Sequence, residues 1–141
     1  MKLNPTGPAR GERALNAITG YGTGFVLVNN ARHESSVIVM PGRVVAWPTA
    51  SFAALALADF ELLAGLDLEI VLLGTGPRLR FPRPELTRPL IEARIGLEVM
   101  DFQAACRTYN FLMAESRRVA AALHETLIIF SPFSDLFGIR R

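Results

Sequence analysis

The sequence predicts an α/β domain in which helices pack on the faces of a mixed β-sheet. The chain has 141 residues, the length of one ordinary domain. Half of its residues are apolar and 20% are charged, which argues against disorder. Short strands joined by short turns come first, and strands alternate with helices after them. This order predicts antiparallel pairs followed by parallel pairs with crossover helices.

Three short strands are predicted in the first part of the chain. The polar segment 1–15 is rich in Pro and Gly, so we expect a loosely held arm before the domain. The glycines of 20–24 predict a tight turn that leads into a strand, and the polar residues 29–34 predict another turn. Prolines at 41 and 48 stop the later strands. The predicted strands are residues 25–28, 36–40 and 44–47.

A helix, a buried strand and a second helix follow. Residues 57–64 are rich in Ala and Leu and the glycine after them is a typical helix stop, although the start of this helix stays open. Residues 68–73 are nearly all apolar, as in a strand buried on both faces. The second helix is expected near 84–94. Because Pro89 has no N–H, it fits best in the first turn of a helix that begins near Leu86, with a kink as the alternative.

The last predicted elements are a strand, a long helix and a strand. Residues 95–100 predict a strand, and Asp101 is a good N-cap for the helix after it. Apolar residues recur at three-and-four spacing over 102–123, so this helix is expected to run for about six turns. An apolar strand is expected at 126–130. The predicted division of the chain is an arm at 1–15, a domain at 16–131 and a tail at 132–141.

Composition excludes several classes of protein. The longest apolar stretch, 50–66, carries two acids and is shorter than the roughly 20 residues that a membrane span needs, so no transmembrane segment is expected. The first residues lack the apolar core of a secretory signal. One cysteine excludes an internal disulfide and a cysteine-based zinc site, which favours a reducing, cytoplasmic compartment. The net charge is +2 and is zero without the two C-terminal arginines, so nucleic-acid binding is not expected.

A crevice at the carboxyl ends of the parallel strands is the candidate ligand site. Ligands of open α/β sheets bind at this edge. It would gather Gly74, Thr75 and Gly76 with Asp101 at the start of the long helix, and Arg78 lies nearby in the sequence. Backbone amides and an arginine there would hold a small anion. The alternative is a tight exit from a buried strand, because the G-x-G lacks the third glycine of a dinucleotide site and the Gly-Lys of a phosphate loop.

No catalytic or metal-binding pattern stands out, so no catalytic residue, metal or cofactor is predicted. Cys106 lies on the apolar stripe of the long helix, where a thiol behaves as a small hydrophobe. His33 falls in a polar turn and His124 at the expected helix end, which predicts solvated side chains. Asp59 and Glu61 are expected at solvated edges. The lack of a catalytic pattern favours a protein that is not an enzyme, but the sequence alone does not decide whether the protein has enzymatic activity.

Two segments are candidates for contacts with another protein. The segment 78–94 interleaves five arginines with prolines around Phe81, which suits a protein–protein surface or an exposed loop that helps solubility. The segment 133–139 has apolar residues at helical spacing, which predicts either folding back on the domain or docking on a partner or a second copy. The oligomeric state and the identity of any partner stay open.

The segment that begins at Asp101 resembles the signature of the Mth938-like family. The similarity covers about residues 16–130; the helix motif is specific, whereas the G-x-G is not. Pro89 departs from the family pattern, and the tail at 132–141 lies outside the match. The residues that carry the resemblance are Trp47, 72–76, 96–100, 101–112, Glu115 and 117–123.

The resemblance implies a three-layer α/β/α domain around a mixed sheet. The family was long catalogued as a domain of unknown function and includes the mitochondrial assembly factor 3 of respiratory complex I. The helix motif carries over the positions Arg107, Thr108, Tyr109, Asn110, Glu115 and Arg118. None has an assigned catalytic role: Tyr109 suits the core, and Glu115 and Arg118 suit an i,i+3 ion pair.

Two function hypotheses follow. The first is a non-enzymatic protein-interaction or assembly module, which serves a respiratory or other membrane complex and has a protein as its partner. The second is a small-molecule (anion) binding protein or an unrecognised enzyme that uses the crevice near Gly74–Gly76 and Asp101. A concave polar pocket at that crevice would favour the second hypothesis.

Overall fold

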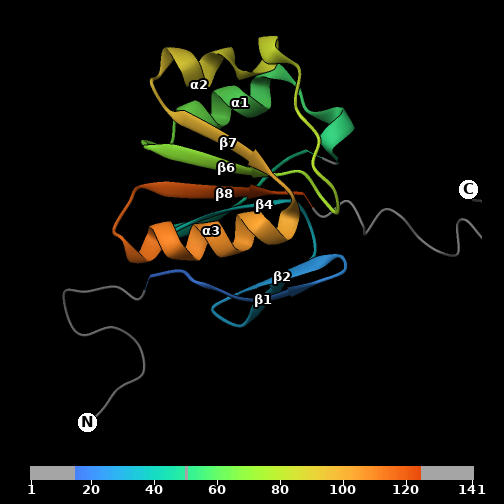
Figure 1. Ribbon diagram of the computed structural model, residues 1–141, viewed down its shortest axis with the longest axis vertical. Coiled ribbons are helices and arrows are strands. Elements are labelled where there is room, and N and C mark those ends of the chain that lie inside the picture. Colours follow the sequence, from blue (N-terminus) through green and yellow to red (C-terminus); the bar gives the residue numbers. More distant parts are fainter. Residues whose placement is uncertain (1–14, 50, 125–141) are drawn as a thin grey trace, which may run out of the picture.

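The computed structural model describes residues 15–49 and 51–124, which fold around a five-stranded sheet (Figure 1). Strands β6, β7 and β8 run parallel to one another, and β4 pairs antiparallel with both β8 and β5, so the predicted mixed sheet is confirmed. In spatial order the strands are β5 (Arg43–Ala46), β4 (Val37–Met40), β8 (Val119–Leu123), β6 (Ile70–Gly74) and β7 (Gly96–Met100).

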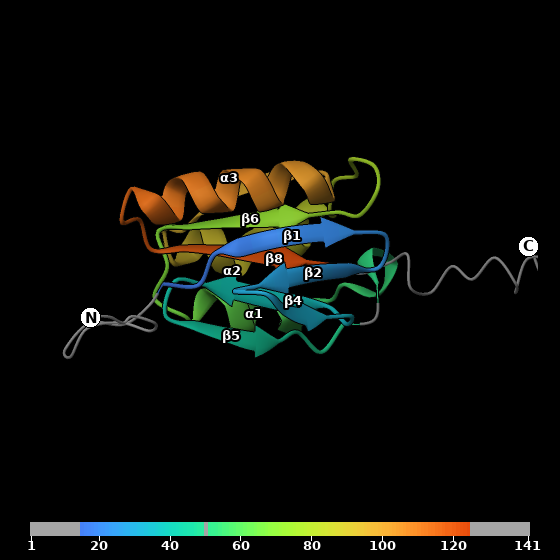
Figure 2. The ribbon, with the colours of Figure 1, turned by 90° about the horizontal axis from the view of Figure 1, so that it is seen from below.

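Helices cover both faces of this sheet, as the three-layer prediction requires. One face carries α1 (Leu57–Ala64) and α2 (Arg88–Glu92), together with the 3₁₀ turns η1 (Phe52–Ala54) and η2 (Pro84–Thr87). The other face carries α3 (Phe102–Ala114), which packs on β6 and β8 (Figure 2). The late start of the second helix is confirmed, because Pro89 lies in the first turn of α2 and needs no hydrogen-bond partner for its nitrogen there.

A separate three-stranded sheet lies beside α3 on the same face (Figures 1 and 2). It consists of β1 (Ile18–Gly22), β2 (Phe25–Val28) and β3 (Ala31–His33) in that order, all antiparallel. Of these, the sequence predicted β2 alone. The glycines of 20–24 were expected to form a turn, but Gly20 and Gly22 belong to β1.

Local contacts explain why β1 and β3 escaped prediction. A Cβ on Gly22 would lie 2.5 Å from the Phe25 ring, so the glycine is needed for the close crossing of a strand. The turn between β1 and β2 is Thr23–Gly24. Asn29 and Asn30 have φ values of 50° and 70°, which is the left-handed geometry of a tight hairpin turn, so the chain reverses there and pairs as β3.

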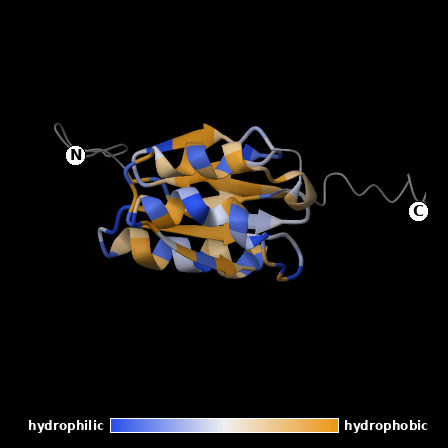
Figure 3. Ribbon diagram, turned by 90° about the horizontal axis from the view of Figure 1, so that it is seen from above, coloured by the Kyte–Doolittle hydropathy of each residue, from blue (hydrophilic) through white to orange (hydrophobic). Residues whose placement is uncertain are grey.

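The core lies on both faces of the five-stranded sheet. Alternate residues of β8 face opposite layers: Ala120 and Ala122 pack toward α1 and α2, and Ala121 and Leu123 pack toward α3 and the small sheet. Figure 3 shows hydrophobic residues running along the strands, whereas the helices alternate between hydrophobic and hydrophilic residues. The strand predicted at 68–73 is accordingly buried, with β6 at Ile70–Gly74.

The long helix is shorter than predicted. It ends at Ala114, and residues 119–123 form β8 at the centre of the sheet. Ser116 has φ 63°, so the chain turns there instead of continuing as helix. The run of alanines fits the spacing of a helix as well as it fits a strand. In a central strand, the small side chains let helices approach both faces of the sheet. The predicted Glu115–Arg118 pair is therefore wrong, because the two residues are not on one helix.

Two further predictions are corrected. Asp59 is not a solvated edge residue: it is 9% exposed and accepts a hydrogen bond from the amide of Ala56 at 2.9 Å, which fixes the start of α1. His124 is neither at a helix end nor solvated, because it follows the last residue of β8 and is 1% exposed. The predicted strand at 126–130, the tail at 132–141 and nearly all of the arm lie outside the described residues, so the domain boundaries stay predictions.

Candidate functional site

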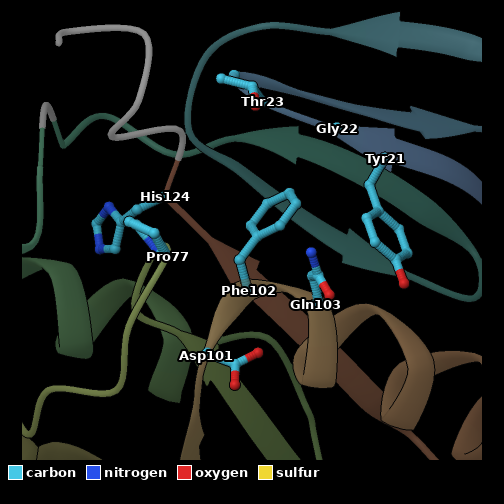
Figure 4. A pocket seen from close by; sticks show the side chains of 10 residues that line it. Tyr21, Gly22, Thr23, Pro77, Asp101, Phe102, Gln103 and His124 are labelled. Atoms are coloured by element: carbon cyan, nitrogen blue, oxygen red, sulfur yellow. The ribbon is translucent and has the colours of Figure 1, made fainter.

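A pocket of about 400 Å³ lies at the edge of the five-stranded sheet where β6, β7 and β8 end, which we call the carboxyl edge. Three parts of the chain enclose it (Figure 4): the turn between β1 and β2, the start of α3, and a third wall with Pro77 and His124. The lining residues are Tyr21, Gly22, Thr23, Gly24, Gly76, Pro77, Asp101, Phe102, Gln103 and His124.

The start of α3 is fixed against the pocket by its own cap. Asp101 accepts a hydrogen bond from the amide of Ala104 at 2.8 Å, which confirms the predicted N-cap. The amide of Phe102 donates to the carbonyl of Gly76 at 2.8 Å and ties the helix to the loop after β6. The Phe102 ring meets Tyr21 edge-on, with 6.1 Å between centroids. The pocket therefore has an aromatic wall and a carboxylate at the helix start.

The residues of the predicted crevice do not all face this pocket. Gly76 and Asp101 line it. Gly74 lies beneath, where a Cβ would be 2.9 Å from Leu123 and 3.1 Å from Ala105, and Thr75 is fully buried. Arg78 is exposed on the loop and is not part of the lining. The carboxylate of Asp101 repels an anion, so this lining suits a ligand with hydrogen-bond donors better than the predicted anion.

Thr75 organises the loop that follows β6. Its hydroxyl donates to the carbonyl of Arg78 at 2.8 Å and accepts from the amide of Arg80 at 3.1 Å. The guanidinium of Arg80 donates to the carbonyl of Thr75 at 3.3 Å. The loop therefore folds back, and Arg80 lies over the carboxyl edge of the sheet instead of extending into solvent.

Arg80 joins three aromatic side chains at this edge, and we call Trp47, Phe52, Arg80 and His124 the Trp47 cluster. Trp47 stacks on His124 with 4.6 Å between centroids and 28° between planes. Phe52 meets His124 edge-on at 6.4 Å, and the guanidinium carbon of Arg80 lies 4.5 Å from the Phe52 centroid. Ser36 Oγ lies 3.5 Å from His124 Nδ1.

Three polar atoms of the Trp47 cluster are buried without a hydrogen-bond partner. They are Trp47 Nε1, Arg80 Nε and His124 Nε2, and the described residues contain no other such side-chain atom. Each unpartnered buried group costs about 1–3 kcal/mol. Burial, and secondarily the charge of Arg80, lowers the pKa of His124 to about 4, so the ring is neutral at pH 7.

The positions carried over by the helix motif do not gather at one site. Arg107 is exposed and donates to the Tyr21 hydroxyl at 3.5 Å, near the pocket, and Thr108 is half-buried on α3. Asn110 accepts from the amide of Ile18 and donates to its carbonyl, each at 2.8 Å, which fastens β1 to α3. Arg118 lies at the opposite edge of the sheet. Asn110 therefore has a structural role, and Arg118 is remote from the pocket.

The opposite edge, where β6, β7 and β8 begin, carries paired surface charges. Arg117 Nε donates to Glu69 Oε1 at 2.7 Å, and Arg118 lies 3.4 Å from Glu69 Oε2 and 3.8 Å from Asp67. The hydrogen bond from Arg117, followed by the backbone of Arg118, lowers the pKa of Glu69. A second hollow of about 500 Å³ lies here and includes Arg43. Arg43, Arg117 and Arg118 share this edge with Glu69 and Asp67, so its charge is net positive.

The core positions of α3 agree with their prediction. Cys106 is 1% exposed on the buried side of the helix, so its thiol is not an accessible nucleophile. Tyr109 is fully buried, its hydroxyl donates to the carbonyl of Asn16 at 2.7 Å, and burial raises its pKa. Both side chains hold the helix on the sheet.

Sequence reasoning missed the Trp47 cluster as a unit. Its members come from four separate segments, so no local motif joins them. Trp47 was assigned to the end of a predicted strand and to the family resemblance, and Arg80 was grouped with its neighbours in a segment that suits a protein–protein surface or an exposed loop. His124 was misplaced because the helix was expected to reach it. The one available signal was that Trp47 is the only tryptophan of the chain.

Metal sites and membrane-spanning segments were both considered in the sequence analysis. Over residues 15–49 and 51–124, no group of three or more His, Cys, Asp or Glu side chains is placed to hold a metal ion. Within the same residues, no helix has the length and apolar character needed to cross a membrane.

The layer order and the strand order define a Mth938-like α/β domain. Comparison with known families gives the more particular assignment. Residues 18–124 match the family described as "Protein of unknown function (DUF498/DUF598)". The chain belongs to this family.

Solved structures and curated relatives agree with this assignment. A Bordetella parapertussis protein is 44% identical with a TM-score of 0.74, covering 79% of this chain and 96% of that one. A Bordetella pertussis protein described as a Mth938-like domain is 37% identical with a TM-score of 0.72, covering 89% and 93%. The NADH dehydrogenase [ubiquinone] 1 alpha subcomplex assembly factor 3 of Bos taurus is 34% identical over 75% of this chain. The match spans 59% of that relative's length.

Proposed function

We propose that this protein is a non-enzymatic interaction module that assists the assembly of a multi-subunit complex, with a respiratory membrane complex as the first candidate. The observation that carries the proposal is its similarity to NADH dehydrogenase assembly factor 3 from Bos taurus, Xenopus tropicalis and Drosophila melanogaster, at 30–34% identity. The chain spans about three-fifths of their length, so the shared unit is the domain itself. We place its action in the cytoplasm, at the face of the complex outside the bilayer.

A surface suited to a protein partner supports this role. The segment 77–94 exposes Phe81 and Ile91, each 69% accessible, and Leu79 at 50%. Five arginines and two glutamates share this segment, and Arg78, Arg83, Arg88 and Arg94 are exposed. Exposed aromatic and aliphatic side chains interleaved with arginine are typical of protein interfaces. An acidic partner surface with apolar side chains fits this segment.

Deletion of the gene tests the proposal. The expected result is loss of the mature complex and accumulation of a smaller subcomplex on native gels, restored by the wild-type gene. The variant F81D/I91D should not restore assembly, because it places charges on the proposed surface. The matched control is Phe111→Asp, which changes an equally exposed aromatic on the opposite face and should restore assembly. Normal levels of every respiratory complex in the deletion strain would contradict the proposal.

A second candidate function rests on the pocket at the carboxyl edge. Its volume of about 400 Å³ lies in the range of small-molecule sites, and it mixes aromatic and polar lining residues. The protein would then be a small-molecule binding protein or an enzyme that uses Asp101 and the start of α3. Thermal stabilisation across a panel of phosphates, carboxylates and amines tests it, with Gln103→Trp as the variant that fills the pocket. If no compound raises the melting temperature of the wild type, this candidate fails.

A further inference from the structure

The Trp47 cluster concentrates unused hydrogen-bonding capacity. Every described buried side-chain nitrogen or oxygen that lacks a partner belongs to it: Trp47 Nε1, Arg80 Nε and His124 Nε2. Buried polar groups in folded proteins are nearly always paired, so three orphans in one cluster are unexpected in a site with a purely structural role. They are linked through ring contacts of 4.6 and 6.4 Å and the Arg80–Phe52 contact of 4.5 Å.

The chemistry of these atoms selects an acceptor. Trp47 Nε1 and Arg80 Nε carry hydrogens and can only donate. His124 can also donate from Nε2, because Ser36 Oγ lies 3.5 Å from Nδ1 and can supply the hydrogen there. Donors from three side chains, one of them a guanidinium, match a group with two acceptor oxygens. We infer that Trp47, Arg80 and His124 form a binding subsite for a carboxylate group.

The charge of the cluster favours a carboxylate over a phosphate. Arg80 brings one positive charge, and the neutral ring of His124 brings none at pH 7. A carboxylate carries one negative charge and is balanced by Arg80. A phosphate monoester carries close to two, which would leave an unbalanced charge in a buried place.

Arg80 is the side chain that opens the subsite. The three orphan atoms are covered in this structure, so a ligand needs one group to move. Trp47 and His124 are 3% and 1% exposed, whereas Arg80 is only half-buried. Arg80 is held by the Phe52 face and by one guanidinium hydrogen bond, to the carbonyl of Thr75 at 3.3 Å. We expect an outward turn of this side chain to admit the ligand, with the charge of Arg80 at the entrance.

This inference does not depend on the proposed assembly role or on ligand binding beside Asp101. The assembly surface involves Phe81 and Ile91, and the pocket test uses Gln103. The subsite shares His124 with the pocket lining and Arg80 with the segment 77–94, but neither F81D/I91D nor Gln103→Trp changes a member of the Trp47 cluster, so the failures of the three proposals can be told apart.

The only tryptophan of the chain makes the test direct. In full-length protein, the indole N–H of Trp47 gives one resonance in a ¹H–¹⁵N spectrum, and its fluorescence reports the same site. Sodium acetate, sodium succinate and sodium phosphate are each titrated against sodium chloride of equal ionic strength at pH 7. Saturable shifts with acetate or succinate, absent with chloride and weaker with phosphate, are expected. Equal response to chloride, stronger response to phosphate, or no saturable response overturns the inference.

Two variants assign the effect to the cluster. Arg80→Gln is expected to weaken carboxylate binding by about 10-fold to 100-fold, because one charged hydrogen-bond donor is lost. Arg78→Gln, the matched control, removes an exposed arginine of the same loop and should bind as the wild type does. Equal losses in both variants overturn the assignment to Arg80. Should Arg80→Gln not fold, His124→Gln is titrated instead and should also bind more weakly.

A last pair of probes separates two sources of the carboxylate. A short peptide with a blocked N-terminus and a free C-terminal carboxylate is compared with its C-terminal amide. Tighter binding of the acid peptide than of acetate, with no binding of the amide, assigns the subsite to a protein chain end. Succinate binding more tightly than the acid peptide assigns it to small free carboxylates. The inference fails if the amide binds as well as the acid.

Discussion

The two edges of the five-stranded sheet use their polar side chains differently. At the edge where β6, β7 and β8 begin, Glu69 and Asp67 pair with Arg117 and Arg118 on the surface. At the carboxyl edge, polar atoms of Trp47, Arg80 and His124 are buried and unpaired, and a pocket opens beside them. At the first edge these charged groups pair with one another beside a hollow of about 500 Å³. The second edge keeps hydrogen-bonding capacity for a ligand.

The positions that carry the family resemblance include both structural positions and site positions. Arg118 belongs to the motif that carries the family resemblance, yet it lies at the edge where β6, β7 and β8 begin, away from the pocket at the carboxyl edge. Asn110 belongs to the same motif and fastens β1 to α3 through two hydrogen bonds to Ile18. The residues with unused chemistry come from loops and from the end of β8. Asn110 and Arg118 of the signature therefore mark the fold, whereas Asp101, Phe102 and Gln103 at its start line the pocket.

The largest expected effect is a loss of stability in mild acid at the carboxyl edge. The pKa of His124 is about 4 in the folded chain and about 6.5 when unfolded, so the unfolded chain takes up a proton first as the pH falls. The free energy of unfolding should decrease between pH 6.5 and 4 by about 3 kcal/mol in total and change no further from this group below pH 4. Urea unfolding at half-unit pH steps measures it.

The His124→Gln variant is the control for that measurement. The difference between wild type and variant isolates this one ring, because all other titrating groups are shared. The curve of the variant should be nearly flat from pH 6.5 to 5, where most carboxylates are still ionised. An equal slope in both proteins would mean that His124 is solvated, and the contrast between the two edges would lose its main support.

A smaller effect is expected from a matched pair of glycines on neighbouring strands. A Cβ on Gly74, at the carboxyl edge, would meet Leu123 at 2.9 Å and Ala105 at 3.1 Å. A Cβ on Gly96, at the other edge, would find its nearest atoms at 3.7 and 3.8 Å. Gly74→Ala should therefore destabilise by about 1–3 kcal/mol, and Gly96→Ala should be neutral or stabilise by up to about 1 kcal/mol.

Chemical denaturation of the two variants decides this prediction. The denaturant midpoint should fall for Gly74→Ala and hold or rise for Gly96→Ala, with unchanged slope. Similar losses in both would contradict the close packing of Gly74 against Leu123 and Ala105. The start of α3, which lines the pocket, would then pack less tightly on β6 than the structure shows.

Sequence patterns predicted the layers well because buried strands and helices show characteristic local patterns of apolar residues. The apolar run at 68–73 and the helix at 57–64 were found from residue type alone, and Asp101 was found as a cap. Prediction failed where one pattern serves two structures. The alanines of 119–123 fit a helix until Ser116 is known to turn the chain, and the glycines of β1 look like a turn until Phe25 is placed across from them.

The candidate site was only partly predictable for a different reason. Gly76 and Asp101 follow adjacent parallel strands, so topology alone brings them to one pocket. Trp47, Arg80 and His124 meet through the antiparallel pairing of β4 with β8 and through a loop folded back by Thr75. Neither the strand pairing nor the fold of this loop can be predicted from the spacing of residues in the sequence. Long-range register and one buried hydroxyl decide where those side chains lie.

The smallest expected effect is at the edge where β6, β7 and β8 begin. Arg118→Ala removes contacts to Glu69 and Asp67 that are open to solvent and shared with Arg117, so we expect little change in melting temperature. The screening length is about 10 Å at roughly 0.1 M salt and is shorter at about 0.5 M. Sodium chloride at about 0.5 M should therefore remove most of the change in melting temperature. The variant should also restore assembly in a deletion strain and bind carboxylates as the wild type does, because Arg118 is remote from both surfaces. Failure in either assay at normal stability would make the edge at Arg118 a functional surface. Arg118 would then be a motif position that belongs to a functional site.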